Sequence, residues 1–214
     1  MLKSKGFWVI LLFFAGVIGV VIYTKKEIRN IDSKGEEIIC FGDSITFGYG
    51  VKPGEDYPSV LSKMIDMPVI NAGLDGDTSI TALKRIKTAV LDKKPFLVLI
   101  EFCGNDFLKD VPQEETVKNI REMVFRIQEE GSIVAIVDVS AGLFLRDYRV
   151  KFSKLAQETG SIFVPAVLSG IITNPSMKSD FMHPNPEGYR IIAERIYRAI
   201  KPYLKSKTVR TELL

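Results

Sequence analysis

Histidine and cysteine are scarce in this sequence. Its 214 residues include one histidine, His183, and two cysteines, Cys40 and Cys103. Two cysteines are too few for a disulfide framework, and we expect both to be buried free thiols. No cluster of histidines and cysteines is available to hold zinc, so we expect neither a metal nor another cofactor.

The sequence also lacks the patterns of nucleic-acid and nucleotide-binding proteins. Its formal net charge is only +3 and it contains no dense basic stripe, which argues against a nucleic-acid partner. It has no Gly-x-x-x-x-Gly-Lys-Ser/Thr run, and no Gly-x-Gly-x-x-Gly follows the first predicted strand. Because these sequences cradle phosphates in the common nucleotide-binding folds, nucleotide binding is disfavoured.

One long run without charge stands near the amino terminus. It extends from Phe7 to Tyr23, which is about the minimum length that spans a bilayer. The run ends in bulky residues, Val20 to Tyr23, rather than in the small residues of a cleavage site, which favours a retained anchor over a signal peptide. Basic residues flank both sides of the run, so the positive-inside rule does not decide the orientation.

The length of the chain favours one domain with a sizeable core. We divide the sequence into a membrane anchor or uncleaved signal at residues 1–23, a polar tether at 24–35, a single domain at 36–205 and a tail at 206–214.

Short apolar runs alternate with amphipathic stretches through this domain. The predicted strands are an apolar run that ends before Gly42 and the segments 68–71, 96–100, 133–139 and 161–165. The predicted helices cover residues 56–65, 78–91, 113–130, 146–159 and 186–204. This alternation predicts an α/β fold in which helices cover both faces of a parallel sheet of about five strands, a three-layer α/β/α domain.

The first predicted strand runs into the turn Gly42-Asp43-Ser44. A serine at this position lies past the carboxyl end of a strand and near a helix start, where open α/β sheets bind their ligands. Backbone N–H groups at such a turn can face a developing negative charge, which suits a nucleophilic serine. Simple helix capping by Asp43 or Ser44 is the alternative interpretation.

Only His183 is available to activate that serine. Asp180 precedes it by three residues, so its carboxylate can hold one tautomer of the imidazole and leave the other ring nitrogen facing the serine. Asn105, after the strand at 96–100, can offer its side-chain N–H to an oxyanion, although an Asx turn is also common there.

Four sequence blocks resemble those of the SGNH (GDSL-type) hydrolases, in the same order. They are Gly42-Asp43-Ser44, the segment from Asn71 to Thr78, Gly104-Asn105-Asp106 and the segment from Asp180 to Pro184. The resemblance spans residues 37 to 203 and is closest to the small bacterial thioesterases, arylesterases and lysophospholipases. It implies a flavodoxin-like sheet and a serine hydrolase.

The resemblance also assigns roles. Ser44 is the expected nucleophile, His183 the base and Asp180 the residue that orients it. The expected oxyanion hole comprises the backbone N–H groups of Ser44 and Gly76 and the side-chain amide of Asn105. One departure is Cys103, which stands where close relatives often carry glycine, and it bears on the shape of the acyl pocket.

Other hydrolase types fit less well. The turn at Ser44 lacks the second glycine of Gly-x-Ser-x-Gly, which disfavours an α/β-hydrolase. A cysteine hydrolase using Cys103 is conceivable, but the residues after it match an oxyanion donor. A membrane-tethered, non-catalytic binding module would not need Ser44, Asn105, Asp180 and His183 all intact.

The expected substrates are small-molecule or lipid acyl esters and thioesters, with acetyl groups on an envelope polysaccharide as the alternative. Leu143, Phe144 and Leu145 could line an acyl pocket or belong to the core. Because relatives of the family are exported, we expect the catalytic domain outside the cytoplasmic membrane, in the periplasm or at the cell surface.

Overall fold

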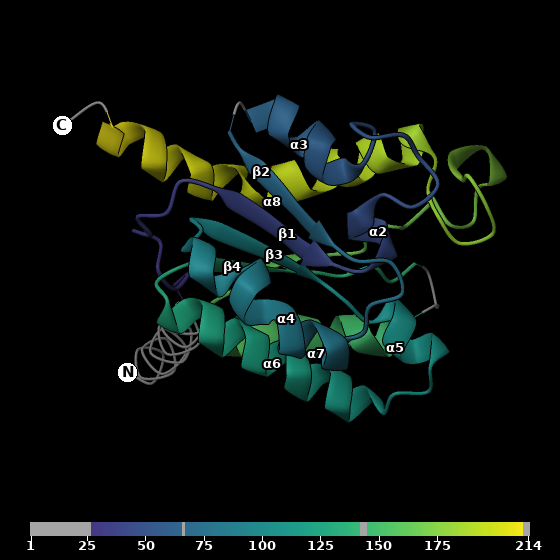
Figure 1. Ribbon diagram of the computed structural model, residues 1–214, viewed down its shortest axis with the longest axis horizontal. Coiled ribbons are helices and arrows are strands. Elements are labelled where there is room, and N and C mark those ends of the chain that lie inside the picture. The colour runs from purple at the N-terminus through teal and green to yellow at the C-terminus, as the bar shows by residue number, and fades with distance from the viewer. Residues whose placement is uncertain (1–26, 66, 142–144, 212–214) are drawn as a thin grey trace, which may run out of the picture.

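Five parallel strands form the central sheet of the computed structural model, which describes residues 27–65, 67–141 and 145–211 (Figure 1). The strands are β1 (Ile38–Gly42), β2 (Val69–Gly73), β3 (Leu97–Glu101), β4 (Ile133–Val137) and β5 (Ile162–Val164). They lie in the order β2-β1-β3-β4-β5, which is the flavodoxin-like order. The predicted parallel sheet of five strands is therefore confirmed.

The three inner strands are buried along their whole length. Every residue of β1, β3 and β4 is buried, because helices cover both faces of the sheet. This explains why the strands are continuous apolar runs and do not alternate between apolar and polar residues. The edge strand β2 is only half-buried.

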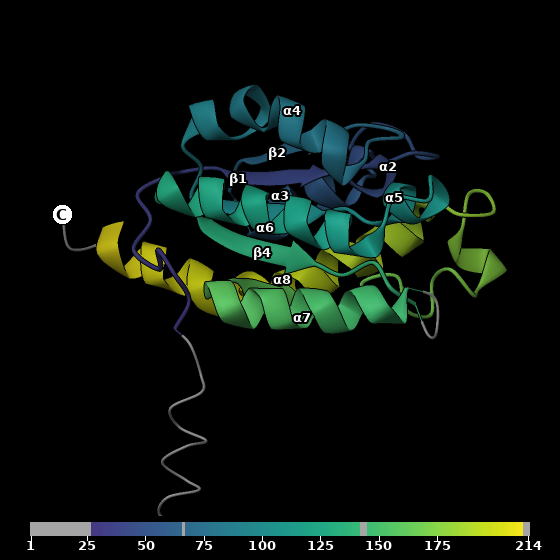
Figure 2. The ribbon, with the colours of Figure 1, turned by 90° about the horizontal axis from the view of Figure 1, so that it is seen from below.

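Helices form a layer on each face of the sheet, as Figures 1 and 2 show. One layer contains α3 (Tyr57–Ile65) and α8 (Pro186–Thr211), which pack against each other. The other contains α4 (Ser79–Ala89), α6 (Gln113–Glu129) and α7 (Arg146–Thr159), with contacts from α4 to α6 and from α6 to α7. The predicted three-layer α/β/α arrangement is confirmed.

The structure differs from the expected elements in its short helices and at its carboxyl end. The helix start expected near Ser44 is present as the short helix α2 (Ser44–Phe47). The helix α5 (Gly104–Leu108) and two 3₁₀ helices at Leu91–Lys93 and Pro175–Met177 were not predicted. The last helix continues through Thr211 and does not end near Leu204. No glycine follows Leu204 before Thr211, so the sequence contains no strong stop signal there.

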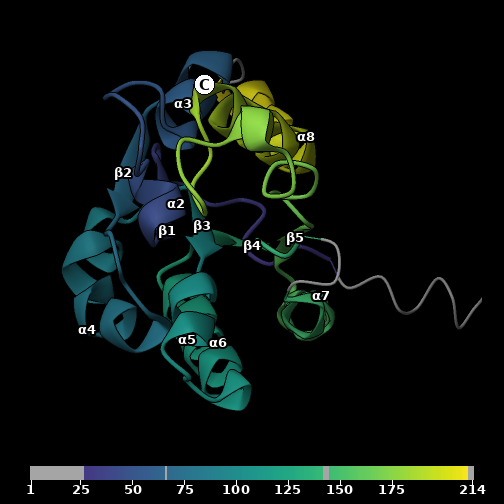
Figure 3. The same ribbon diagram turned by 90° about the vertical axis from the view of Figure 1, so that its right-hand side faces the viewer.

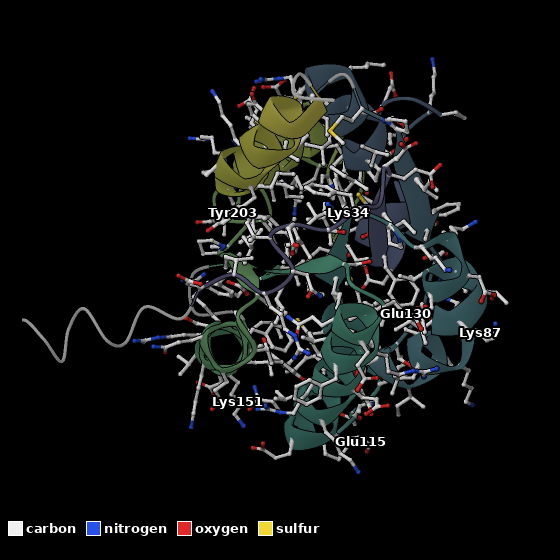
Figure 4. All side chains as sticks on the ribbon, turned by 90° about the vertical axis from the view of Figure 1, so that its left-hand side faces the viewer. Lys34, Lys87, Glu115, Glu130, Lys151 and Tyr203 are labelled. Atoms are coloured by element: carbon white, nitrogen blue, oxygen red, sulfur yellow. The ribbon has the colours of Figure 1, made fainter. Side chains whose placement is uncertain are left out.

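The first described residues pack against the amino-terminal edge of the sheet. The Arg29 N–H donates to the Gly160 carbonyl, and the Asn30 side chain donates to the carbonyls of Gln128 and Ser132 at 2.7 and 3.0 Å. Figure 4 looks onto this edge, with Lys34 in front of the sheet and Lys87 and Glu115 on the outer sides of their helices. Part of the segment predicted as a tether is thus held against the domain.

Among residues 27–65, 67–141 and 145–211, none of the helices is apolar over a length that would cross a bilayer. The predicted anchor at residues 1–23 lies outside the described residues.

Candidate active site

The predicted nucleophile, Ser44, is the first residue of the short helix α2. Asp43 caps this helix by accepting the Ile45 N–H at 3.0 Å. The strand before it must end in glycine, because a Cβ at Gly42 would lie 2.1 Å from Oγ1 of Thr46. The sharp strand-to-helix turn therefore presents Ser44 at the carboxyl-terminal edge of the sheet, the edge that faces the viewer in Figure 3.

The structure places Ser44, His183 and Asp180 in one hydrogen-bonded chain. Oγ of Ser44 lies 3.1 Å from Nε2 of His183, and Nδ1 of the same ring lies 2.8 Å from Oδ2 of Asp180. The loop that carries Asp180 and His183 precedes α8 and returns to this edge from the end of β5 (Figure 3). A chain of this kind can transfer a proton from the hydroxyl to the imidazole.

The Asp180 carboxylate is held in its charged form. Its Oδ1 accepts the backbone N–H groups of Met182 and His183 at 2.7 and 2.8 Å. Desolvation opposes ionisation, but the hydrogen bonds from the His183 ring and from these two amides outweigh it and lower the pKa of Asp180 to about 2. In the neutral imidazole, this carboxylate favours the tautomer with its hydrogen on Nδ1, in which Nε2 can accept the Ser44 proton.

Tyr49 also contacts the histidine, and sequence reasoning missed it. The centroids of the Tyr49 and His183 rings are 4.4 Å apart with an interplanar angle of 37°. The Tyr49 backbone is fixed in turn, because its carbonyl accepts the Tyr189 hydroxyl at 3.1 Å. A tyrosine in the turn after a nucleophile carries no distinctive signal, since only the fold brings residue 49 next to residue 183.

Asn105 shares a cavity with the serine and the histidine. The ends of β1 and β3 are level, because Gly42 pairs with Glu101, so α5 begins beside α2. Ser44, Asn105 and His183 all line one cavity of about 390 Å³. The structure therefore brings Asn105 to the same cavity as the predicted nucleophile and base.

Gly76 lies in the loop after β2. The described residues that line the cavity do not include it. Its φ of +73° is in the left-handed region that favours glycine. Its carbonyl accepts Nζ of Lys109 at 2.6 Å, which links the loop to the end of α5. The level ends of β1 and β2, where Gly42 pairs with Gly73, place the loop at the same edge of the sheet.

Cys103 has an unusual backbone conformation. Its φ is +152°, a region that side chains other than that of glycine rarely adopt, which fits the glycine that close relatives often carry there. The thiol is fully buried, and burial raises its pKa well above the ordinary value. A buried, protonated thiol is a poor nucleophile, so Cys103 is unsuited to the cysteine-hydrolase alternative. Both cysteines are free and buried.

The cavity beside Ser44 is lined mainly by apolar side chains. Leu145 lines it, together with Leu108, Val139, Leu168, Ile172, Phe181 and Met182. Leu143 and Phe144, which were also candidates for the acyl pocket, lie outside the described residues. An apolar cavity of this size next to a hydroxyl and an imidazole is suited to hold the hydrocarbon part of a small ligand.

Sequence comparisons with a family model and with individual proteins point to the same family. A model of the GDSL-like lipase/acylhydrolase family matches residues 40–191. An arylesterase of Vibrio mimicus is 29% identical over 183 residues, which cover 79% of this chain and 90% of the arylesterase. Thioesterase 1/protease 1/lysophospholipase L1 of Escherichia coli K12 is 25% identical over 175 residues, or 78% of this chain and 84% of that enzyme.

Solved structures share the fold. The crystal structure of TesA has a TM-score of 0.74 at 24% identity, covering 78% of this chain and 99% of TesA. The crystal structure of AlinE4, an SGNH-hydrolase family esterase, has a TM-score of 0.63 at 28% identity, covering 85% of this chain and 98% of AlinE4. The matched residues 40–191 include every predicted site residue.

Proposed function

The chain belongs to the GDSL-like lipase/acylhydrolase family and hydrolyses ester or thioester bonds, and we propose that it does so through an acyl-enzyme on Ser44. The resemblance noted from the sequence blocks is thereby confirmed at the level of the family. The observation that carries the proposed mechanism is the hydrogen-bonded chain from Asp180 through His183 to Ser44.

In the proposed first half-reaction, Nε2 of His183 takes the proton of the Ser44 hydroxyl as Oγ attacks the acyl carbonyl carbon. The tetrahedral intermediate collapses, and the leaving alcohol or thiol departs with the proton from Nε2. A water molecule then gives its proton to His183 and attacks the acyl-enzyme. The acid is released, and the proton returns from His183 to Ser44. Asp180 remains ionised and holds the imidazole in the required tautomer.

The negative charge of the intermediate needs donors that are fixed in advance. We assign this role to the backbone N–H of Ser44, the backbone N–H of Gly76 and the side-chain amide of Asn105. Asn105 is supported by its place in the cavity of Ser44, and Gly76 by its place in the loop at the same sheet edge. Removing one such donor costs about 10²–10³-fold in kcat, so Asn105→Ala is expected to lower kcat by that factor.

The cavity supports an acyl chain as the group bound beside Ser44. Its apolar lining favours aryl or aliphatic acyl esters, thioesters and lysophospholipids over acetylated sugars, whose hydroxyl groups would need polar partners. Carbohydrate O-acetyl esterase activity is therefore the second candidate.

The test is hydrolysis of p-nitrophenyl esters from acetate to decanoate by the full chain, with Ser44→Ala beside it. We expect turnover that increases from acetate to medium chains and that is lost in the variant. An optimum at acetate would favour the carbohydrate esterase. A folded protein without turnover on any ester would support the non-catalytic binding module.

We also propose that residues 1–23 anchor the protein in the cytoplasmic membrane, with the domain of residues 36–205 outside the cytoplasm. The support is the uncharged run from Phe7 to Tyr23, which has about the length of a bilayer span. A periplasm-active reporter fused after Leu214 is expected to be active, with the protein resisting alkaline extraction from membranes. A reporter active only in the cytoplasm would overturn the orientation.

A further inference from the structure

Two buried acidic residues line the same cavity as the proposed nucleophile. Asp43 and Glu101 are 2% and 1% exposed. The pairing of Gly42 with Glu101 places them at the neighbouring ends of β1 and β3, where each carboxyl affects the pKa of the other. Among the described residues, neither forms an ion pair with lysine, arginine or histidine. Two ionised carboxylates in contact without a cation would be strongly unfavourable in such a site.

The hydrogen-bond partners of the two carboxyl groups differ, and the difference favours a proton on Glu101. Oε2 of Glu101 accepts the Thr46 hydroxyl at 2.8 Å, but no donor in the described part of the chain reaches its Oε1. An ionised Glu101 would therefore bury an acceptor without a partner, which is costly. A proton on Oε1 turns that oxygen into a donor for the adjacent Asp43 carboxylate.

Asp43 is the member of the pair suited to be charged. Its Oδ1 accepts the Ile45 N–H at 3.0 Å, and the nearby side chains of Glu101 and Asn105 favour its charged form. Burial raises the pKa of Asp43, and the Ile45 N–H and the neighbouring side chains oppose that rise. Burial, and then the Asp43 charge, raise the pKa of Glu101 well above its ordinary value. The carboxyl with a buried oxygen that has no partner among the described residues, Glu101, is therefore the one suited to hold a proton.

This arrangement bears on the proposed oxyanion donor. The Asn105 amide nitrogen has two hydrogens, and only that nitrogen can donate to the Asp43 carboxylate. An Asn105 N–H directed at the Asp43 carboxylate would orient the amide and leave the second N–H for the cavity that Asn105 shares with Ser44. The charge on Asp43 therefore connects the turn of Ser44 with the oxyanion donor.

We propose that Glu101 is a positioning residue whose protonated carboxyl donates to Asp43 and so holds both the Ser44 turn and the Asn105 amide in the reactive geometry. The inference rests on the proposed serine mechanism and adds a requirement for one buried proton. Two hydroxyl groups also hold the Glu101 carboxyl. The Thr46 hydroxyl donates to Oε2 of Glu101, and the Tyr57 hydroxyl lies 2.9 Å from Oγ1 of Thr46.

Other groups also face the pair and enter any pH dependence. The titratable or charged groups around Asp43 and Glu101 are Cys40 on β1, Tyr57 on α3, Arg85 on α4, Cys103 and Asp106 at α5, Tyr189 on α8, and Lys178 and His183 across the cavity. Substitution of Glu101 leaves all of them in place, so the comparison with the unmodified protein isolates the proton on Glu101.

The test compares Glu101→Gln and Glu101→Leu in the full chain. Glutamine keeps a donor towards Asp43 and an acceptor for Thr46 without a titratable proton. We expect Glu101→Gln to keep kcat near neutral pH within about threefold and to lack the fall at alkaline pH that ionisation of Glu101 causes in the unmodified enzyme. Glu101→Leu is expected to lose on the order of 10²-fold in kcat, with KM little changed, because small misplacements of reacting groups cost about that much.

Gln128→Leu is the matched control. Gln128 is 2% exposed and also has one side-chain oxygen without a partner among the described residues, but it lies at the opposite edge, bonded to the Thr159 carbonyl. It is expected to change stability and leave kcat unaltered. Equal kcat losses in Gln128→Leu and Glu101→Leu would reduce Glu101 to a general structural role and overturn the proposal.

Infrared spectroscopy tests for the proton on Glu101 independently of enzyme activity. The carbonyl stretch of a protonated carboxyl is expected in the unmodified protein near neutral pH and should be missing from Glu101→Gln, which decides the question even where Glu101→Leu does not fold. Absence of that band, or identical pH profiles of the unmodified and Gln proteins, would overturn the inference. Lack of esterase activity in the unmodified protein would instead count against the proposed function.

Discussion

The Asp180 carboxylate has its two oxygens in different roles, and this leads to a prediction about the imidazole. Oδ1 accepts two backbone N–H groups and Oδ2 faces Nδ1 of His183. In Asp180→Asn, the amide oxygen must stay with the backbone donors, so the amide nitrogen faces the ring. That nitrogen would force Nδ1 to accept and Nε2 to carry the hydrogen, which is the wrong tautomer for taking a proton from Ser44.

We therefore expect Asp180→Asn to lower kcat by about 10⁴-fold, as a wrong tautomer does in serine proteases, and to be less active than Asp180→Ala. Alanine imposes no tautomer. Steady-state kinetics on a p-nitrophenyl ester measures both variants. An Asn variant more active than the Ala variant would mean that the backbone amides do not orient this side chain.

The conformation of Cys103 leads to a second prediction at the level of a residue. Cys103→Gly and Cys103→Ala both remove the buried sulfur, but only glycine adopts a φ of +152° without strain. Such strain is worth about 1–3 kcal/mol, and the extra chain entropy of glycine offsets up to about 1 kcal/mol of it. We expect the Gly variant to have the larger free energy of unfolding in urea, by about 1–2 kcal/mol.

Cys40 provides the control for this comparison. It is equally buried but lies in the regular strand β1, where glycine is less favourable than alanine by about 0.5–1 kcal/mol. The order of the two variants should therefore be reversed at Cys40. The same order at both positions would contradict the strain at Cys103.

At the scale of elements, α4 holds the strand ends that carry the site. Arg85 on this helix donates to Asp77 at 2.7 Å, to the Ala72 carbonyl at 2.9 Å and to the Gly42 carbonyl at 3.2 Å. One side chain thus connects the end of β1, the end of β2 and the residue after Gly76. The guanidinium also lies 4.4 Å from the centroid of the Phe41 ring.

Arg85→Met is expected to lower the free energy of unfolding by about 1–3 kcal/mol, because it leaves buried acceptors without donors, and to lower kcat as the turn of Ser44 loses support. Lys87→Met on the same helix is the control. Its ion pair with Asp92 is exposed, with side chains 70% and 47% accessible, and such pairs contribute at most about 1 kcal/mol. Urea unfolding measures both, and equal effects would argue against this role of Arg85.

At the scale of the whole molecule, the start of the described chain and the candidate site lie at opposite edges of the sheet. Arg29 and Asn30 contact the amino-terminal edge, whereas α2, α5 and the loop before α8 lie at the carboxyl-terminal edge (Figure 1). A membrane anchor at residues 1–23 would therefore be joined to the face of the domain remote from Ser44.

Removal of residues 1–26 is expected to leave kcat and KM on a soluble ester unchanged within about twofold. Removal of residues 1–33 also deletes the hydrogen bonds of Arg29 and Asn30, and is expected to lower the free energy of unfolding by about 1–3 kcal/mol. Thermal melts and steady-state kinetics of the two truncated proteins separate these effects. A loss of activity in the shorter truncation would show that the amino-terminal segment reaches the site.

The sequence by itself determined the sheet, the two helix layers and the places where chemistry could occur. Apolar runs and helical periodicity are local patterns, and in a parallel sheet every loop after a strand opens at the same edge. The turn at Ser44, the block at Asn105 and the segment from Asp180 to His183 could therefore be assigned to one edge before the structure was known. The short helix α5 escaped prediction because five residues carry too little periodicity.

Only the tertiary structure decided how these residues meet. The stacking of Tyr49 on His183, the contact of Glu101 with Asp43 and the packing of Asn30 on the carbonyls of Gln128 and Ser132 join residues far apart in the chain. In the sequence, Glu101 is simply an acidic residue after an apolar strand. The register of β1 and β3 pairs Gly42 with Glu101, so Glu101 is buried next to the Asp43 carboxyl. Burial of this kind depends on contacts between strands, which no local sequence pattern encodes.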